Sequence, residues 1–533
     1  MKASTFFVIA WAISISAFAQ TSAPAAPTLT AGAEFKGLRF DWDTVPGATR
    51  YQLEYRAHQT GDFLELGDDL AATQTSTHFS FPLHLFDWTY ARYRLAACND
   101  AGCSRSAEVS VSGLRREAVG YFKAGQSKLK AYFGSAIDLS PDGYNLVVSA
   151  PGEVTQTSGG SAGGAVYTFR RGSNGKWIQR ARLEPHAMSR GDYVSLDVAI
   201  SGSGNTVAVG QGSDVAGATN KSGQVDVFSL KNNVWTRTRI PRLASADTFS
   251  GVQLSESGDI LAIAASSPTH SAAIYKSVNG VWQNVRNFSQ NELGYQENCN
   301  NPVLSRDGSA IAELCFDTGS GTRLMRDYIR VHWGTNWAQR TDLDLDHPAS
   351  LETRWFHSGF GMDRTGSTFA VQYTRDLDRD GTGEAWIQVI TRNGHSWTDL
   401  TQINSGSWRN SADRNNFANS ISISGDGHTM AIGDPADNGT SWGPRAAPLV
   451  AGTAQTGAVY VYRLTSQWRL INMVKPNYNP NPGSSHIFGR ITALSQTGKT
   501  LVVAVPEENS SAKGIDGDWA NSDLQWSGAL FMY

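Results

Sequence analysis

A short pattern of apolar and polar positions recurs along the chain from Phe133 onward. Each repeat has a small apolar strand, a polar turn ending in glycine, a second apolar strand, a variable loop, a third strand of alternating apolar and aromatic residues, and a fourth strand that opens with tryptophan. The turns lie at 140–143, 201–204, 255–258, 305–308, 363–366, 424–427 and 495–498. Unbroken apolar runs such as Leu146-Val147-Val148 follow them, which is typical of strands buried on both faces. The pattern predicts seven four-stranded units, the signature of a seven-bladed β-propeller.

The last repeat lacks its fourth strand. Fourth strands open at Trp177, Trp235, Trp282, Trp337, Trp397 and Trp468, which makes six for seven turns. The chain stops at 528–533, a segment that aligns with a third strand, whereas residues 117–124 stand where every later repeat is preceded by a fourth strand. We therefore predict that residues 116–124 complete the last blade. Such an N-terminal strand would close the ring and remove two open sheet edges.

A different pattern occupies residues 24–111. The segments 38–42 and 51–56 alternate with period two around the turn Pro46-Gly47-Ala48, and residues 93–99 show the same alternation. About 90 residues of short strands with one inward tryptophan predict a β-sandwich. The chain is thus expected to be all-β, with a signal peptide at 1–19, a sandwich at 20–113 and a propeller at 114–533.

Both parts resemble known families. The sandwich is similar to a fibronectin type III domain in Pro27, Trp42, the turn ending at Tyr51 and the strand 93–99, and that family implies a spacer or binding surface without chemistry. The repeats resemble the FG-GAP, or integrin α-subunit-like, propellers of exported bacterial proteins. The matching segments are 133–135, 149–152 and 163–167 in the first repeat, 432–435 and 457–460 in the sixth, and 488–490 and 504–506 in the seventh; repeats three to five match incompletely.

The N-terminus predicts export. Lys2 is followed by an apolar core at 6–13 and by Ala17-Phe18-Ala19, the order of a Sec-type signal peptide. No later stretch approaches the roughly 20 apolar residues of a transmembrane helix. We expect a soluble protein in the periplasm, at the cell surface or outside the cell. With 45 Lys and Arg against 48 Asp and Glu, nothing suggests binding to nucleic acid or to an anionic membrane.

Export makes disulfides possible for the four cysteines. Cys98 and Cys103 flank a tight turn, and Cys299 and Cys315 bracket a strand-turn-strand segment whose ends return to one place. These local geometries favour the pairs Cys98–Cys103 and Cys299–Cys315, although four cysteines allow three connectivities. Buried free thiols are the alternative, and a zinc site is disfavoured because no His or Cys pair stands at ligand spacing.

One acidic loop, 376–384, has the form of a calcium loop. Its carboxylates alternate, with Gly at the sixth position and Glu at the ninth, so that side-chain oxygens and one carbonyl can surround Ca²⁺. Integrin-like propellers use loops of similar form, and the resemblance implies a ligand set of Asp376, Asp378, Asp380, the Thr382 carbonyl and Glu384. The loop departs from that family because it joins the second and third strands rather than the first two. A solvated acidic turn, partly balanced by Arg379, is the alternative.

The longest loops join second and third strands at 153–161, 436–455 and 507–525, and we expect them on one face. Trp442, Trp519 and Trp526 make that face a candidate contact for a protein or a glycan, with simple loop packing as the alternative. The Gly-x-Ser-x-Gly match at 439–443 lacks the strand-to-helix turn of a nucleophile elbow and is explained by chance.

These features favour an exported, non-catalytic binding or adhesion-type protein. A carbohydrate-active enzyme, lyase or hydrolase, with a site at the propeller mouth is the alternative and rests on fold analogy. Carboxylates that converge at the channel mouth would favour the enzyme. A channel lined by small apolar residues would count against it.

Overall fold

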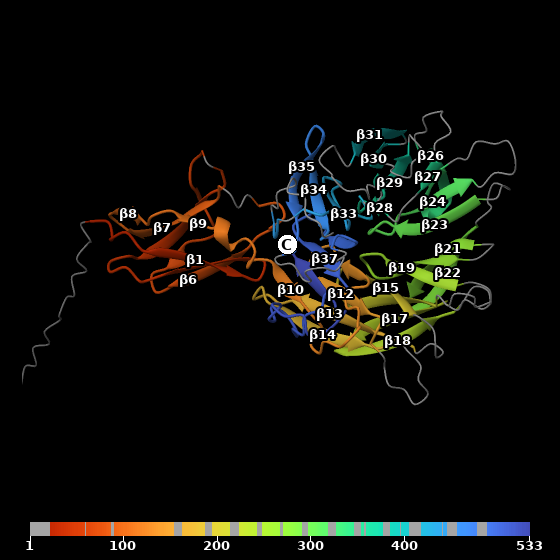
Figure 1. Cartoon of the computed structure of the whole chain (residues 1–533), viewed down its shortest axis with the longest axis horizontal. Coiled ribbons are helices and arrows are strands. Elements are labelled where there is room, and N and C mark those ends of the chain that lie inside the picture. The colour runs from red at the N-terminus through yellow and green to blue at the C-terminus, as the bar shows by residue number, and fades with distance from the viewer. Residues whose placement is uncertain are drawn as a thin grey trace, which may run out of the picture. The chain divides into compact units, whose positions relative to one another are not determined.

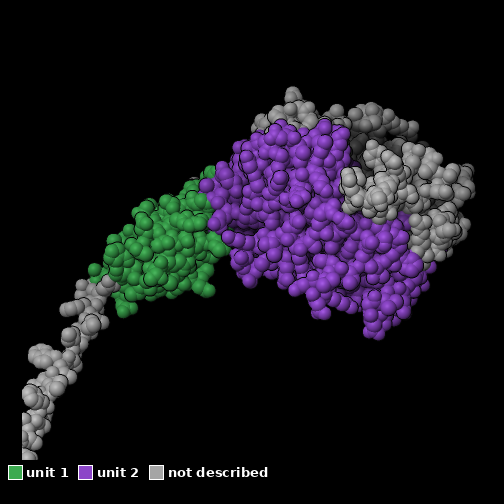
Figure 2. Space-filling view, turned by 90° about the horizontal axis from the view of Figure 1, so that it is seen from below, with its two compact units in different colours: residues 1–32, 39–79, 87–113 green, residues 33–38, 80–86, 114–533 purple. Residues whose placement is uncertain are grey.

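The computed structural model of the chain describes residues 22–58, 60–86, 90–153, 163–186, 194–213, 223–241, 248–266, 270–289, 297–317, 327–345, 353–355, 359–376, 384–394, 396–404, 417–439, 441–444, 456–476 and 488–533. The chain divides into two compact units (Figures 1 and 2). Unit 1 comprises Met1–Gly32, Arg39–Phe79 and Asp87–Gly113, and unit 2 comprises Ala33–Leu38, Ser80–Phe86 and Leu114–Tyr533.

Strands make up nearly all of the regular structure. In the described part of the chain, the helical segments are two short 3₁₀ turns, η1 (Ser112–Leu114) and η2 (Thr335–Trp337). Neither of them has the length or apolar character needed to cross a membrane. The prediction of an all-β protein is confirmed.

Unit 1 is built mainly from two sheets around one core. One sheet has the order β1–β2–β6, and the other has the order β4–β3–β7–β8, with β5 paired to β3 and β9 paired to β7. The strands are β1 (Leu29–Glu34), β2 (Gly37–Trp42), β3 (Arg50–Arg56), β4 (Leu64–Glu65), β5 (Leu70–Ala71), β6 (Ser76–Ser80), β7 (Arg92–Asn99), β8 (Gly102–Arg105) and β9 (Val109–Ser110). Phe40 of β2 and Tyr93 of β7 are fully buried with ring centroids 4.7 Å apart, so the two sheets pack face to face.

Unit 2 holds seven sheets within its described residues, which we number in chain order. Sheets 1 to 3 contain β11 (Ile137–Leu139), β12 (Asn145–Ala150), β13 (Ala165–Arg171) and β14 (Trp177–Leu183); β15 (Val194–Ile200), β16 (Thr206–Ser213), β17 (Gly223–Lys231) and β18 (Val234–Ile240); and β19 (Thr248–Leu254), β20 (Ile260–Ser266), β21 (His270–Val278) and β22 (Val281–Ser289). In each of them the strands are hydrogen-bonded in chain order.

Sheets 4 to 7 continue this order. They contain β23 (Glu297–Leu304), β24 (Ala310–Asp317), β25 (Asp327–Trp333) and β26 (Gln339–Asp344); β27 (Thr353–Trp355), β28 (Phe360–Met362), β29 (Thr368–Asp376), β30 (Glu384–Asn393) and β31 (Ser396–Asn404); β32 (Ser420–Ile423), β33 (Thr429–Asp434), β34 (Ala458–Leu464) and β35 (Trp468–Val474); and β36 (Ile491–Leu494), β37 (Leu501–Val505) and β38 (Ala529–Met532) with β10 (Gly120–Phe122). The one addition to the pattern is in sheet 5, where both β27 and β28 pair with β29.

The seven sheets form a closed cycle. The first strand of each sheet contacts the first strand of the next, in the order β11, β15, β19, β23, β28, β32 and β36, and β36 contacts β11 again. Figure 1 shows the labelled strands of unit 2 following one another around this cycle. Four-stranded antiparallel sheets arranged around a central axis are a β-propeller. The structure therefore confirms a propeller.

Apolar side chains between neighbouring sheets hold the cycle together. All six residues of β12 and all five of β37 are buried, as expected for second strands covered on both faces. Between sheets 7 and 1, one cluster joins Phe122, Leu146, Phe169 and Leu530. Each sheet buries both faces only because a neighbour stands on each side.

Strand β10 joins the two ends of unit 2. It pairs antiparallel with β38, with Tyr121 opposite Phe531, and so takes the outer position of sheet 7. The strand is shorter than the predicted segment, because residues 116–119 continue a turn in which the Ala118 and Val119 N–H groups donate to Leu114 and Arg116. Sheet 7 thus consists of three strands from the end of the chain and one from before sheet 1.

The outer edge of β10 is itself covered. The Lys123 N–H donates to the Gly514 carbonyl at 2.7 Å, and the Gly514 N–H donates to the Ala124 carbonyl at 3.0 Å. The Asp516 N–H donates to the Tyr121 carbonyl at 2.9 Å. The loop that precedes β38 therefore satisfies backbone groups that an edge strand would expose.

Replacing residues 116–124 with a Gly/Ser segment of equal length should open the edge of β38 and remove the fully buried rings of Tyr121 and Phe122. Because losing one such ring costs about 3–5 kcal/mol, we expect the unfolding free energy to fall by about 5 kcal/mol or more, with oligomers forming through the open edge. Calorimetry and size-exclusion chromatography measure both effects. Leu129→Ser, at a side chain that is 59% exposed, is the control and should change stability by less than about 0.5 kcal/mol. A monomer of unchanged stability would contradict the closing role.

Candidate functional site

The predicted calcium loop joins β29 to β30. Asp376 ends β29 and Glu384 begins β30, with Arg375 opposite Glu384 in the register, whereas Asp378, Asp380 and Thr382 lie outside the described residues. In the part of the chain that the structure describes, no three His, Cys, Asp or Glu side chains are grouped to hold a metal ion. The calcium site stays a prediction.

The three loop tryptophans, Trp442, Trp519 and Trp526, are all half-buried. Trp526 stacks on Tyr132 with centroids 5.8 Å apart, and the Lys130 ammonium lies 5.2 Å from its ring. The main-chain N–H of Trp526 also donates to the Asn509 side-chain oxygen at 2.7 Å. Trp526 is therefore held in one orientation while part of its surface stays accessible, an arrangement that suits an aromatic contact residue.

Both predicted disulfides are present. Cys98 pairs with Cys103, and Cys299 pairs with Cys315. Each pair lies directly opposite in an antiparallel ladder, the first across β7 and β8 and the second across β23 and β24. The four cysteines are thus structural links between adjacent strands, and none is a free thiol.

The polar turns between first and second strands explain the repeated Ser-x-x-Gly pattern. In sheet 1, the Gly143 N–H donates to the Ser140 carbonyl at 2.8 Å, and the Ser140 hydroxyl accepts the Asn145 N–H at 2.8 Å. Gly143 has a φ of 74°, a conformation that favours glycine. In sheet 5 the Asp363 carboxylate replaces the serine hydroxyl and accepts the Ser367 N–H at 2.8 Å. The repeated Ser-x-x-Gly pattern is therefore explained by the hydrogen bonds and the positive φ that this turn needs.

These turns also bond to one another around the channel. The Gly202 N–H donates to Glu256 at 2.8 Å, the Glu256 N–H to Arg306 at 2.6 Å, and the Asp307 N–H to Arg364 at 3.2 Å, all to backbone carbonyls. Gly425 donates to Gln496 at 2.8 Å, and Gln496 donates to Pro141 at 2.9 Å. A belt of main-chain hydrogen bonds therefore connects neighbouring turns at one end of the propeller.

Two ion pairs cross the channel at this end. Arg306 of sheet 4 donates from Nη1 to Oδ2 of Asp138 in sheet 1 at 3.0 Å, and its Nη2 contacts Oδ1. Arg364 of sheet 5 donates from Nε to Oε2 of Glu256 in sheet 3 at 3.0 Å. Gln496 of sheet 7 donates to the same oxygen at 3.2 Å. Side chains from non-adjacent sheets thus meet across the axis.

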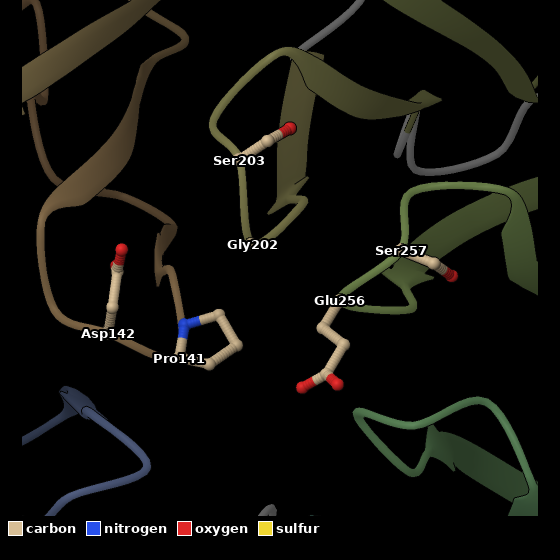
Figure 3. Close-up of a pocket in the computed structure, with 6 residues that line it drawn as sticks. All are labelled: Pro141, Asp142, Gly202, Ser203, Glu256 and Ser257. Carbon is tan, nitrogen blue, oxygen red and sulfur yellow. The ribbon is translucent and has the colours of Figure 1, made fainter.

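The channel beside these pairs is a cavity of about 190 Å³ with a mixed lining, in which Ile137, Val303 and Phe360 stand beside polar and charged side chains such as Asp138, Asp363 and Gln496. A second hollow of about 440 Å³ lies among the turns of sheets 1 to 3. Figure 3 shows the Glu256 side chain reaching into it from its turn, opposite Pro141 and Asp142. Glu256 is therefore accessible from the turn face of the propeller.

The electrostatics of the channel favour charge neutralisation over acid catalysis. The hydrogen bond from Arg364 lowers the pKa of Glu256, so its carboxylate stays ionised. Burial raises the pKa of Asp197 to about 6, but its oxygens accept the Val198 and Val252 N–H groups at 2.9 and 2.8 Å, and it does not line the channel cavity. Neither carboxylate is placed as a general acid facing a free base.

Three sheets share a buried acid–base anchor at the start of a long loop. In sheet 1, Glu153 lies just after β12, is fully buried, and accepts Arg182 of β14 at 3.0 Å and the Tyr167 hydroxyl at 2.5 Å. In sheet 6, Asp437 lies just after β33 and accepts Lys475 at 2.6 Å and the Tyr460 hydroxyl at 2.6 Å. The acid and the tyrosine come from equivalent places in the two sheets, whereas Lys475 lies two residues beyond Met473, which occupies the ladder position of Arg182.

Sheet 7 builds the third anchor with the closing strand. The Lys123 ammonium, next to β10, donates to Glu508 at 2.6 Å, to the Ser510 carbonyl at 2.7 Å and to the Ser527 hydroxyl at 2.6 Å. Both charged side chains are fully buried. Burial lowers the pKa of Lys123 while Glu508 opposes the shift. The full set of hydrogen bonds is what allows a buried charge pair to persist.

The sequence carried a signal for these anchors that the analysis of motifs missed. Each acid stands two residues after a proline, in Pro151-Gly152-Glu153, Pro435-Ala436-Asp437 and Pro506-Glu507-Glu508. The partner cation lies on another strand at a variable distance along the chain, so linear spacing could not identify the pair. Comparing the same position across repeats would have found it.

Comparisons with known proteins give structural matches alone. Neither a protein-family model nor a curated protein sequence matches the chain. Among solved structures, the periplasmic gluconolactonase of Pseudomonas aeruginosa is similar at 10% identity and a TM-score of 0.36, covering 80% of this chain and 96% of that chain. The Dos1 propeller is similar at 10% identity and a TM-score of 0.39, covering 79% and 96%. An oligogalacturonate lyase from Vibrio parahaemolyticus is similar at 8% identity and a TM-score of 0.36, covering 78% and 95%. The propeller assignment rests on the closed cycle of sheets rather than on these matches.

Lys123→Met should leave Glu508 as an unpaired buried carboxylate and lower the unfolding free energy by about 3–5 kcal/mol. The double variant Lys123→Met/Glu508→Met removes both charges and should recover a large part of that loss. Urea unfolding of the two single variants and the double variant gives the coupling energy. Glu184→Gln is the control, because this 57% exposed carboxylate pairs with Arg182 at the surface. The substitution should lower the unfolding free energy by less than about 1 kcal/mol. A double variant no more stable than Lys123→Met would contradict the account.

Proposed function

We propose that the chain is an exported, non-catalytic binding or adhesion-type protein whose propeller loops contact a protein or a glycan. The observation that carries this proposal is the set of buried anchors at Glu153, Asp437 and Glu508. Each of them fixes the start of one of the longest loops against the fourth strand of its own sheet. Recognition by loops needs such a rigid base.

The proposed architecture is a fibronectin III-like sandwich at 20–113 followed by an FG-GAP-type, seven-bladed propeller at 114–533. The seven sheets and their closed cycle support the blade count, and the pairing of β10 with β38 supports the closing strand. The two sheets of unit 1 around Phe40 and Tyr93 support the sandwich. Export through the signal peptide at 1–19 agrees with two disulfides, which persist in oxidising compartments.

The channel gives less support to a carbohydrate-active enzyme. A glycosidase or lyase needs a carboxyl group with a raised pKa facing a second carboxylate or a base. Asp138 is instead bound to Arg306, and Glu256 to Arg364, which lowers the pKa of Glu256. The two carboxylates at the channel are therefore explained by ion pairs that link non-adjacent sheets across the axis.

Screening the purified protein on glycan and protein arrays tests the proposed function. We expect at least one ligand, with an affinity that falls about 30-fold or more in Trp526→Ala because a buried aromatic contact is worth about 2 kcal/mol or more. Ile178→Ala, at a 59% exposed residue of β14 outside the loops, is the matched control and should bind normally. Turnover of a bound glycan, or affinity unchanged in Trp442→Ala, Trp519→Ala and Trp526→Ala alike, would refute the binding role.

We also propose that the loop 376–384 binds Ca²⁺ through Asp376, Asp378, Asp380, the Thr382 carbonyl and Glu384. Calcium should then release heat on titration and raise the midpoint of thermal unfolding, and Asp378→Ala should abolish both effects because it removes one charged ligand. Asp344→Ala is the control, since Asp344 is an exposed carboxylate at the end of β26 and is not part of the loop. If the unsubstituted protein shows neither heat nor a thermal shift, the site does not exist.

A further inference from the structure

A basic hollow of about 410 Å³ lies where sheet 1 meets sheet 2. Tyr144, Arg170, Arg171 and Arg180 line it from sheet 1, and Ser203 and Asn205 line it from the first turn of sheet 2. It stands at the end of the sheets that carries the first turns, whereas the long loops leave from the opposite ends of the strands. The hollow is therefore separate from the proposed loop surface, and its function does not depend on that surface.

Three arginines and one carboxylate line the hollow, so cations outnumber anions there. Arg180 donates to the Gly204 carbonyl at 3.1 Å and to Asn205 Oδ1 at 3.2 Å, and Arg171 donates to the Gly175 carbonyl at 3.0 Å. The side chain of Arg170 makes no hydrogen bond or ion pair to any described residue. None of the three arginines pairs with a carboxylate in the described part of the chain.

One acid, Asp142, also lines the hollow. Its Oδ1 accepts the Ser140 hydroxyl at 2.5 Å and the Tyr144 N–H at 2.9 Å, so it serves the turn. Burial and the nearby Arg170 both lower the pKa of Arg180, as expected for neighbouring cations. A bound anion would relieve this repulsion.

The repeats provide an internal comparison for these positions. Arg170 lies opposite Asn145, and the residues at the equivalent ladder position in sheets 2 to 6 are Ser229, Lys276, Trp333, Thr391 and Arg463. Arg180 is the extra residue of a β-bulge between β13 and β14, where sheets 3 and 6 have Val285 and Ile471. Arg171 donates its N–H to the Tyr144 carbonyl, and Leu230, Ser277, Arg392 and Leu464 make the same bond in sheets 2, 3, 5 and 6.

The fold thus requires no arginine at any of these positions. Single cations occur there in other sheets, namely Lys276, Arg392 and Arg463, but within the described sheets all three positions are arginine in sheet 1 alone. Because equivalent positions meet the same structural demands, a concentration of charge in one repeat points to a ligand rather than to packing.

The remaining lining indicates what accompanies the negative charge. Tyr144 is 50% exposed, and the Arg171 guanidinium lies 5.6 Å from the centroid of its ring. The Ser203 hydroxyl and the Asn205 amide add neutral hydrogen-bonding groups across the hollow. Aromatic surface beside hydroxyl and amide groups suits a hydroxylated ring, and clustered guanidinium groups suit a carboxylate or sulfate oxyanion. The volume lies within the range of small-ligand sites.

We propose that this hollow binds an acidic saccharide, with its carboxylate or sulfate ester among Arg170, Arg171 and Arg180 and its ring against Tyr144. The shared chemistry is an oxyanion on a polyhydroxylated ring. Since charge pairing at an open hollow is screened by counter-ions, affinity should fall with rising ionic strength.

Titration calorimetry at low ionic strength with D-glucuronate, D-glucose 6-sulfate, D-glucose and inorganic sulfate tests the proposal. We expect binding of one or both acidic sugars, no detectable binding of glucose, and at least tenfold weaker binding of inorganic sulfate. Arg170→Gln should weaken the binding of the acidic sugar about tenfold, because a hydrogen bond to a charged group is worth about 1.5–3 kcal/mol and 1.4 kcal/mol is a factor of ten. Binding of only one acidic sugar would identify the preferred oxyanion.

Arg463→Gln is the matched control, because Arg463 occupies the equivalent ladder position in sheet 6 and is exposed like Arg170. It should leave the affinity unchanged, and thermal unfolding should be the same for both variants. Three results would overturn the proposal: no binding of either acidic sugar at millimolar concentration, equal affinity in Arg170→Gln and the unsubstituted protein, or inorganic sulfate binding as tightly as the acidic sugars. Loss of array ligands with this site intact would concern the loop surface alone.

Discussion

The pairing of β10 with β38 is the contact on which the rest of unit 2 depends. Every sheet of the propeller buries its faces against two neighbours, so an incomplete sheet would weaken both of its interfaces. Sheet 7 becomes complete only when a strand that precedes sheet 1 joins the final strand, with Tyr121 opposite Phe531. The same strand brings Lys123 to Glu508 and so also fixes the base of one long loop.

Charged groups stabilise this protein in two ways that depend on their surroundings. At the partly exposed turns, Arg306 and Arg364 cross the channel to Asp138 and Glu256 and restrain sheets that do not touch along their strands. Inside sheets 6 and 7, the anchors at Asp437 and Glu508 are buried and need several hydrogen bonds each to offset the loss of hydration. In both places the carboxylates have a structural partner. The three arginines around Tyr144 differ, because none of them forms an ion pair with a carboxylate among the described residues.

The sequence predicted those features that arise from local and repeated constraints. The Ser140 hydroxyl and the positive φ of Gly143 stabilise one turn, and because the other turns have the same geometry, the glycine recurs at all seven turns and the serine at six of them, which reveals the repeat. The two disulfides followed from strand-turn-strand geometry for the same reason. Contacts between distant positions could not be predicted in this way: Asp138 meets Arg306 across 168 residues of chain. Three ligands of the candidate calcium loop, Asp378, Asp380 and Thr382, lie outside the described ranges, so there the sequence remains the sole source of the hypothesis.

The closing strand also sets the order in which the chain can finish folding. Lys123 and Glu508 are separated by 385 residues. Until the last sheet is made, Lys123 therefore lacks its carboxylate partner and strand β10 lacks the strand with which it pairs. Contacts of such long sequence separation form late and slowly, because the entropy of closing a large loop precedes any gain from the contact. During synthesis, the partly built ring would therefore display apolar edges that are prone to association. The yield of the closed molecule should thus depend on how fast ring closure proceeds relative to self-association.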